Sequence, residues 1–229
     1  MSPWFDDRRH ATVEQIKEQL AYREANKEKV VAFHVTRTLG ERTKVLLDED
    51  KGEFMVAKTS NLRDENPDVL AFADVTGCRV EIDEDRDEVT RTDKDGNEIS
   101  YNPPRYRYYY DFDVIIDVRH PYFDDMRFRL NHSRVDIEHT EHAGSTARIG
   151  GLSLNLGGGS AYDPMNYPEY RQYVEMGEEI KQVLLGARQQ ARDHAAAAAA
   201  PKQNVLCPWC GATTVSGGAC EFCGGALNG

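Results

Sequence analysis

The clearest pattern in the chain is an alternation of apolar and charged residues between positions 105 and 119. Most odd positions of this segment carry Arg or Asp. The even positions are all apolar, namely Tyr106, Tyr108, Tyr110, Phe112, Val114, Ile116 and Val118. Successive residues of a strand point to opposite faces, so the pattern predicts a long strand with one buried side.

Shorter segments with the same alternation flank this strand. They lie at 31–35, 44–47, 54–56, 78–82, 126–130 and 135–137. The acidic run at 48–52 predicts a hairpin between the second and third of them, and the Asp95-Gly96 step favours a tight turn before the long strand. Together these segments give about six or seven antiparallel strands, which is compatible with a small barrel or sandwich.

Two helices are expected at the ends of this β region. Thr12 and Gln15 have the spacing of a capping box, which predicts a helix from Thr12 to about Lys29. Its few apolar positions, Val13, Ile16 and Leu20, predict a narrow stripe that packs on the main domain or on another subunit.

A second helix is expected to begin at Pro168, where apolar residues return at helical spacing. One helix after a run of strands favours a pleckstrin-homology-like antiparallel barrel that the C-terminal helix caps. The expected fold class is therefore mainly β with flanking helices (α+β), with a small zinc ribbon added. The expected organisation is an N-terminal segment and helix (1–29), the β domain with its helix (30–190), an Ala-rich linker (191–203) and the ribbon (204–229).

The strongest chemical signal is a pair of C-x-x-C-G motifs near the C-terminus. They supply Cys207 with Cys210, and Cys220 with Cys223. Each motif makes a tight turn that presents two thiolates, so we expect one tetrahedral zinc site. Four thiolates leave no position for water or substrate, which makes this zinc structural. A redox C-x-x-C and a pair of disulfides are the alternatives.

Three other features have competing readings. Cys78 shares an apolar face with Val80 and Ile82, which predicts a core residue, and the alternative is a reactive thiol. The acidic segment 83–95 is expected to be a solvated excursion between strands, and the alternative is a calcium loop. The Gly-rich segment 143–166, with its loop at 144–160, is interpreted as a flexible loop, and the alternative is a phosphate cradle.

Charge and hydropathy narrow the function classes. The sequence holds 28 Lys and Arg against 39 Asp and Glu, a net charge of -11, which repels nucleic-acid phosphates and anionic lipids. No apolar run reaches the roughly 20 residues that span a bilayer, so no integral membrane segment is expected. The first residues lack the pattern of a signal peptide, and we expect a cytoplasmic protein whose partners are proteins, a second copy of the chain included, or cations.

An enzyme is the main alternative to a binding protein. Its site would lie around His132, Asp136, His139 and His142, although these residues do not form the His-Glu-x-x-His helix pattern. A further alternative is nucleic-acid binding through the ribbon, or through Arg105 and Arg107 beside their tyrosines. Acidic neighbours offset the positive charge of those arginines, and Lys202 is the single basic residue of 201–229. Both observations disfavour nucleic-acid binding.

Several segments resemble a known family. They are 2–10 (Ser-Pro-Trp-Phe-Asp-Asp-Arg-Arg-His), 12–17 (Thr-Val-Glu-Gln-Ile-Lys) and 101–106 (Tyr-Asn-Pro-Pro-Arg-Tyr). Over about residues 2 to 140 the chain is similar to the body of uncharacterised bacterial proteins that carry an N-terminal cysteine knuckle, domain of unknown function 4428. This sequence has no such N-terminal cysteines. Segment 72–80 is similar to a strand of bacterial pleckstrin-homology-like domains.

The resemblance implies an architecture and no reaction. No Ser/His/Asp or Cys/His set occurs in a known catalytic pattern, and the expected metal site is closed. The sequence therefore predicts a non-enzymatic, zinc-binding protein-interaction or assembly module.

Overall fold

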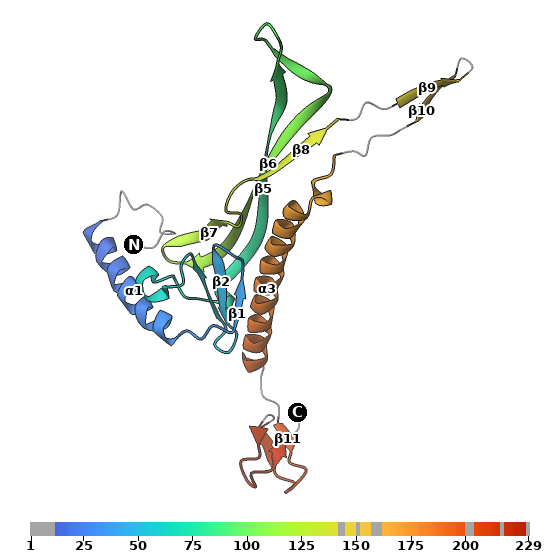
Figure 1. Ribbon diagram of the computed structural model, residues 1–229. Helices are drawn as coiled ribbons and strands as arrows, with labels where there is room; N and C mark the ends of the chain where they lie inside the picture. Colours follow the sequence, from blue (N-terminus) through green and yellow to red (C-terminus); the bar gives the residue numbers. More distant parts are fainter. Residues whose placement is uncertain are drawn as a thin grey trace. The chain divides into compact units, whose positions relative to one another are not determined.

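The computed structural model describes residues 12–141, 145–149, 152–156, 162–199, 204–215 and 218–227. It divides the chain into two compact units, Met1–Gln189 and Gln190–Gly229. The described residues are mainly β, with antiparallel sheets and a long C-terminal helix (Figure 1). No described helix is long and apolar enough to cross a membrane.

Helix α1 (Val13–Ala32) begins at the predicted capping box. The backbone N–H of Gln15 donates to Thr12 Oγ1 at 3.3 Å, and the Gln15 side chain accepts from the Thr12 N–H at 2.8 Å. These bonds satisfy two of the free amides at the start of the helix. Two of the three residues of the expected apolar stripe are not packed against the described residues, because Val13 is 62% and Leu20 56% exposed, whereas Ile16 is half-buried.

Polar side chains of α1 form hydrogen bonds and an ion pair with the domain. The Asn26 side chain donates to the Pro67 carbonyl at 2.8 Å and accepts from the Val69 N–H at 3.1 Å. Arg23 forms a 2.8 Å ion pair with Asp68, a carboxylate with no exposed surface. A buried carboxylate needs such a partner, so this contact fixes the helix at one place on the domain.

The first sheet has four antiparallel strands in sequential order. They are β1 (Arg37–Leu39), β2 (Lys44–Asp48), β3 (Glu53–Ala57) and β4 (Leu70–Ala71). The short helix α2 (Leu62–Glu65) lies between β3 and β4 in the chain. The predicted hairpin of β2 and β3 is confirmed, with Leu46 opposite Met55.

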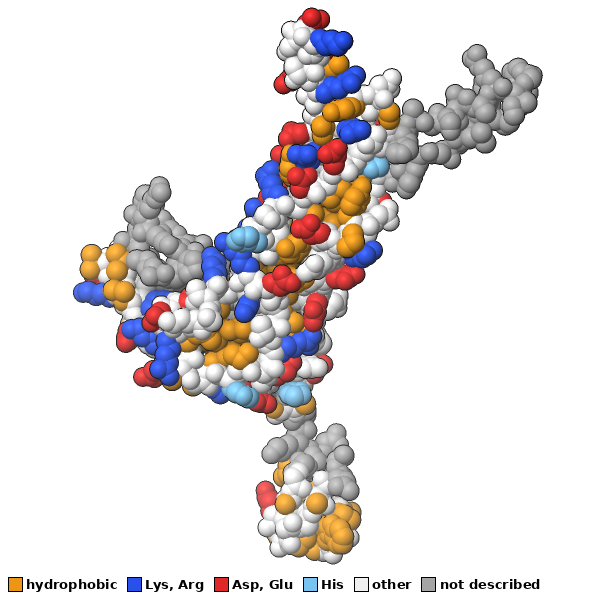
Figure 2. All heavy atoms as spheres, in the orientation of Figure 1, with side chains coloured by type: hydrophobic (Ala, Val, Ile, Leu, Met, Phe, Trp, Pro, Cys, Tyr) orange, Lys and Arg blue, Asp and Glu red, His pale blue; other side chains and the backbone are white. Residues whose placement is uncertain are grey.

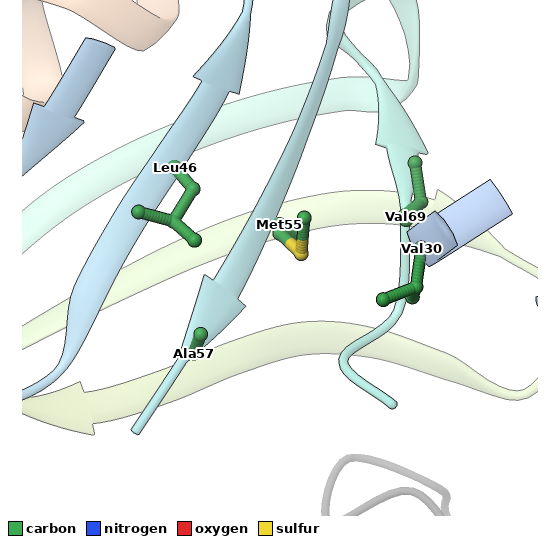
Figure 3. Close-up of a cluster of buried hydrophobic side chains, with 5 residues drawn as sticks. All are labelled: Val30, Leu46, Met55, Ala57 and Val69. Atoms are coloured by element: carbon green, nitrogen blue, oxygen red, sulfur yellow. The ribbon is translucent and has the colours of Figure 1, made fainter. Parts of the chain in front are cut away.

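The strand expected at 31–35 is wrong. Helix α1 continues to Ala32, and Val31 is 62% exposed while Val30 is buried. Val30 packs against the first sheet in a small apolar cluster (Figure 3). Its other buried members are Leu46, Met55, Ala57 and Val69. The alternating pattern therefore does not produce a strand here, because burial of Val30 in this cluster favours continuation of the helix.

The second sheet is built around the long strand that the alternation predicted. Its strands are β5 (Val75–Thr92), β6 (Glu98–His120), β7 (Phe123–Arg129) and β8 (Val135–Thr140), and the 3-10 turn η1 (Phe72–Asp74) precedes them. Strand β6 pairs with β5, β7 and β8, all antiparallel. Phe112, Val114 and Ile116 have no exposed surface, which confirms the predicted buried face.

The acidic segment from 83 onward is not an excursion between strands, because β5 extends through it to Thr92. Its residues pair with β6, where Asp83 lies opposite Asp111 and Glu88 opposite Tyr106. The predicted turn follows at Gly96, which has a φ of 87°. This charged segment has no apolar face, and it forms a strand because its backbone pairs with β6.

Helix α3 (Pro168–Ala199) covers the apolar face of the second sheet, as Figure 1 shows. The Tyr170 ring meets Tyr110 at 4.7 Å and Phe112 at 5.1 Å, both edge to face. At Gly177 a Cβ atom would lie 2.9 Å from a methyl group of Val80, so the absence of a side chain allows the helix to approach the sheet. The helix includes Ala-rich residues of the expected linker up to Ala199.

The described strands form no closed barrel. Part of the expected Gly-rich loop forms a hairpin of β9 (Ser145–Ile149) and β10 (Leu152–Leu156). The 3-10 turn η2 (Pro164–Asn166) then leads into α3. The sequence Gly157-Gly158-Gly159-Ser160 lies outside the described residues.

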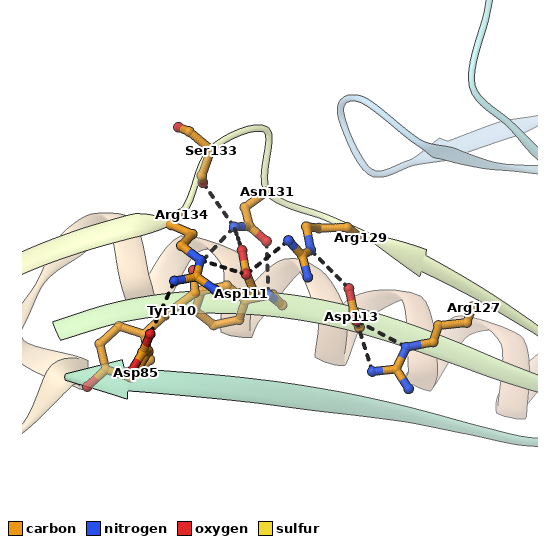
Figure 4. Close-up of polar contacts among 10 residues, drawn as sticks. Asp85, Tyr110, Asp111, Asp113, Arg127, Arg129, Asn131, Ser133 and Arg134 are labelled. Carbon is orange, nitrogen blue, oxygen red and sulfur yellow. Dashed lines mark hydrogen bonds and ion pairs between the residues drawn. The ribbon is translucent and has the colours of Figure 1, made fainter.

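The other face of the second sheet carries a network of ion pairs (Figure 4). Asn131 has no exposed surface, accepts from the Phe112 N–H at 2.9 Å and donates to Asp111 at 3.0 Å. Asp111 also pairs with Arg129 at 2.9 Å and with Arg134 at 3.1 Å. Over the visible face of the first unit, Figure 2 shows basic and acidic side chains interspersed.

Candidate metal centre

The C-terminal unit presents its cysteines from two hairpin turns. Strand β11 (Asn204–Leu206) pairs with β12 (Thr213–Val215), and β13 (Gly218–Ala219) pairs with β14 (Ala226–Leu227). One C-x-x-C-G motif connects each pair of strands. The sequence motif therefore coincides with the turn in both halves of the ribbon.

The two turns have the same backbone hydrogen bonds. The Cys207 N–H donates to the Ala212 carbonyl at 2.8 Å, and the Cys220 N–H donates to the Gly225 carbonyl at the same distance. Each terminal glycine of the motif donates back to the carbonyl of the first cysteine, again at 2.8 Å. Both glycines have a positive φ, 74° and 69°, which a residue with a side chain rarely adopts. The second cysteine of each motif is thereby turned toward the first.

The four sulfur atoms converge from the two turns. Cys207 Sγ lies 3.6 Å from Cys223 Sγ, and Cys210 Sγ lies 3.8 Å from Cys220 Sγ. All four lie within 4.8 Å of one another, and none of the cysteines forms a disulfide. Four thiolates at the Zn–S distance of about 2.3 Å would have sulfurs about 3.8 Å apart, so the set fits a tetrahedral metal ion.

Backbone amides favour ionised sulfur in this cluster. The Trp209 N–H donates to Cys207 Sγ at 3.4 Å. The N–H groups of Cys223 and Phe222 lower the pKa of Cys220 to about 6, because hydrogen bonds stabilise the thiolate. The Gly225 N–H also lowers the pKa of Cys223, but the neighbouring thiols outweigh it and raise that pKa to about 12, so the amides favour one thiolate of this coupled pair. A metal ligand must be the thiolate, so these amides prepare the cluster for a cation.

Large apolar side chains surround the cluster without being buried. Leu206 is 71%, Trp209 75% and Phe222 70% exposed, the three highest values among the exposed large hydrophobic residues of the described chain. Trp209 and Phe222 occupy the same position in the two C-x-x-C-G motifs. The buried cluster of the ribbon is small in comparison, with Cys207, Cys220 and Leu227 packed beside Val205.

The alternative catalytic residues do not converge. Asp136 and His139 lie on β8 with odd separation, so their side chains leave opposite faces of the strand. Asp136 is exposed beside Arg107 at 3.5 Å, whereas the His139 ring lies 5.0 Å from the Tyr162 ring. His132 is exposed in the turn before β8, and His142 lies outside the described residues.

The remaining candidate groups have structural roles. Cys78 is 8% exposed, and burial raises its pKa to about 11, which agrees with the expected inert core residue. Arg105 stands 4.4 Å from the Tyr101 ring, and Arg107 is paired with Glu138 at 3.2 Å. Within the described residues, the four ribbon cysteines are the one set of metal-type ligands that comes together.

Sequence reasoning missed the packing of the first ribbon turn on the second. The Trp209 indole N–H donates to the Ala226 carbonyl at 3.3 Å, and the ring lies against Gly225. The Gly-Gly doublet at 224–225 was the available signal, because the first motif is followed by Ala212 at the equivalent place.

Comparisons with protein-family models, with curated proteins and with solved structures found no match for this chain. The resemblance to the uncharacterised bacterial family therefore stays a prediction. The site is defined by its own residues, which can hold one metal ion in a closed four-sulfur arrangement.

Proposed function

We propose that this chain is a non-enzymatic protein-interaction or assembly module whose C-terminal ribbon is folded by one structural zinc ion. The observation that carries the proposal is the convergence of four sulfurs beside fully formed turns. Cys207, Cys210, Cys220 and Cys223 would hold the ion, whose chemistry here is to bind the two turns together. The buried apolar cluster is small, so metal binding, on the order of 10 to 16 kcal/mol in comparable modules, would supply the folding energy.

The exposed side chains of the ribbon support a protein as the partner. Leu206, Trp209 and Phe222 remain in solvent, and aromatic residues of this kind are common energetic centres of protein interfaces. Figure 2 shows hydrophobic side chains gathered on the visible face of the ribbon. Glu221 is the one charged residue of the described ribbon, and four thiolates outweigh the charge of one zinc ion. A negative, apolar surface disfavours nucleic acid as the partner.

The absence of convergent catalytic groups in the described residues also favours binding over catalysis. Asp136 and His139 point to opposite faces of β8, and the four-sulfur centre leaves no open coordination position. We further propose that residues 30–190 are related to pleckstrin-homology-like domains. The supporting observation is the order of the elements, antiparallel strands followed by the single long helix α3. A cytoplasmic location belongs to the same proposal.

The test uses full-length protein in its native host. A photo-reactive amino acid at position 222 should cross-link one protein reproducibly, and the same amino acid at Thr213, which is exposed on the same ribbon, should give at least tenfold less product. The Leu206→Ser, Phe222→Ser variant should retain its metal and lose cellular function. Equal cross-linking from both positions would contradict a specific interface.

The enzyme alternative is tested by His139→Ala combined with His142→Ala. A binding module should keep its cellular function, because neither residue belongs to the ribbon. Loss of function with unchanged stability, metal content and cross-linking would overturn the proposal in favour of an enzyme.

A further inference from the structure

The ring of His120 lies where α1 meets the turn that joins β6 to β7. Its centroid is 5.0 Å from the Tyr22 ring of α1 and 5.5 Å from the Tyr122 ring of the turn, both edge to face. The ring of Phe123, the first residue of β7, is 4.1 Å away. Tyr22 also meets Tyr122 at 5.4 Å. Three aromatic rings from two sides of the contact therefore pack against one imidazole.

A backbone hydrogen bond depends on the protonation state of this imidazole. The Tyr122 N–H donates to Nδ1 of His120 at 3.3 Å. Nδ1 can accept only while it carries no proton, because both nitrogens of a charged imidazole are donors. His120 and Phe123 form the pair of β6 and β7 next to the turn, so the bond lies within the connection of these strands. The folded turn therefore favours the neutral form of His120.

The charged groups that face His120 come from three other parts of the fold. Burial has the largest effect and lowers the pKa of His120 below its ordinary range. Asp68 before β4 and Asp74 of η1 favour the charged form without offsetting burial, and Lys29 of α1 disfavours it. Asp68 is already engaged in the 2.8 Å ion pair with Arg23. The surroundings therefore disfavour a positive charge on the imidazole, in agreement with the hydrogen bond at Nδ1.

The first half of α1, residues 13–22, is held less firmly than the second half. Two of its large aliphatic residues are exposed. Gln19 is 7% exposed, and its Oε1 atom has no hydrogen-bond partner among the described residues, which opposes docking. The second half has the hydrogen bonds of Asn26 and the burial of Val30. The contact of Tyr22 with His120 therefore has a large share in the docking of the first half.

We propose that protonation of His120 releases residues 13–22 of α1 from the turn between β6 and β7. The added proton removes the acceptor for the Tyr122 N–H and places a positive charge among aromatic rings, and release returns that charge to water. A released histidine takes up its proton near pH 6.5, whereas the docked histidine, with its lowered pKa, does so at more acidic pH. The docked state binds fewer protons in this interval, so a fall in pH favours release.

Hydrogen–deuterium exchange of the full chain at about pH 7.5 and about pH 5.5 tests the proposal, with each rate corrected for the pH dependence of intrinsic exchange. Ordinary carboxyl groups titrate near pH 4, so this interval isolates histidine. The protection of residues 13–22 should fall several-fold at the lower pH. The fall should not exceed about tenfold, the limit for one proton whose released-state pKa is about 6.5. The protection of residues 110–118 in β6 should stay within about twofold.

Two substitutions of His120 remove its titration in different ways. His120→Asn keeps an acceptor oxygen near the place of Nδ1, and His120→Phe keeps an aromatic ring without an acceptor. In each variant the protection of residues 13–22 should be the same at both pH values, whatever its level. Lost packing alone would lower the protection equally at both pH values, so the pH dependence separates a titrating contact from a merely structural one.

His34→Asn is the matched control, because His34 is exposed and follows the end of α1 by two residues. This variant should keep the full pH response of wild type. The proposal is overturned if the response persists in both His120 variants. It is also overturned if the protection of residues 13–22 in folded wild-type protein does not change between the two pH values.

Discussion

The indole ring of Trp209 packs directly on the backbone of Gly225. A Cβ atom at position 225 would stand 2.5 Å from Trp209 Cδ1 and 2.9 Å from Cγ. Real Cβ atoms essentially never come this close to another heavy atom, so the contact requires glycine. The first metal-binding turn therefore contacts the second through the Trp209 ring, which is otherwise 75% exposed.

Gly225→Ala should displace the Trp209 ring and break its 3.3 Å hydrogen bond to the Ala226 carbonyl. Because the ring is exposed, it can move outward, and the expected cost is on the order of 1 kcal/mol or less of ribbon stability. The measurement is tryptophan fluorescence in a Trp4→Phe background, where Trp209 is the single indole. The emission should shift toward that of solvent-exposed tryptophan.

Ala212→Gly is the matched control for this substitution, because Ala212 has the equivalent position in the first turn. Its emission spectrum should equal that of the parent protein. An unchanged spectrum in Gly225→Ala would show that the ring does not pack on position 225.

Phe112→Ala should destabilise the first unit by about 3 to 5 kcal/mol, because it opens a cavity between β6 and α3. Phe112 has no exposed surface, and its ring contacts Tyr170 at 5.1 Å and Tyr173 at 5.4 Å. Urea unfolding followed by circular dichroism measures the change. Arg119→Ala, at an exposed position of the same strand, should stay within about 0.5 kcal/mol of wild type. A loss below about 1 kcal/mol in Phe112→Ala would contradict the assigned face.

Asp48 should make the free energy of unfolding of the first unit depend on pH in the acidic range. Burial of its carboxylate raises the pKa, but N–H donation from His34 at 2.9 Å and Lys51 at 3.1 Å outweighs burial, and the net pKa is lowered. A lowered folded-state pKa contributes stability above the unfolded value of about 3.9, and that contribution is lost as the pH falls through the folded pKa.

Asp48→Asn should therefore be less stable than wild type at neutral pH, by about 1 to 3 kcal/mol. The reason is that the Asn side chain has one acceptor oxygen, whereas the carboxylate accepts one N–H on each of its two oxygens. The gap should narrow as the pH falls below about 4. Urea unfolding across this range measures it, with Asp124→Asn as an exposed control. A gap that stays constant down to about pH 2 would contradict the lowered pKa.

Local patterns predicted the elements whose cause is local. The alternation around Phe112 needs one buried face, the capping box spans the four residues from Thr12 to Gln15, and each C-x-x-C-G motif forms its own turn. These features were identified from sequence because neighbouring residues alone determine them.

Long-range contacts decided the elements that the patterns missed. Val30 keeps its segment helical because it packs against the first sheet, and the acidic residues of β5 become a strand because β6 pairs with them. Local spacing in the sequence does not record such long-range contacts, so these elements could be identified in the folded chain alone.

The measurement that tests the central claim most directly is elemental analysis of protein prepared without chelators, combined with Cys220→Ser. Wild type should hold one zinc ion per chain, bound by the four converging cysteines. Cys220→Ser should lose the ion and unfold the ribbon, while the urea transition of the unit Met1–Gln189 stays unchanged. Wild-type protein that is folded and contains no metal would contradict the account.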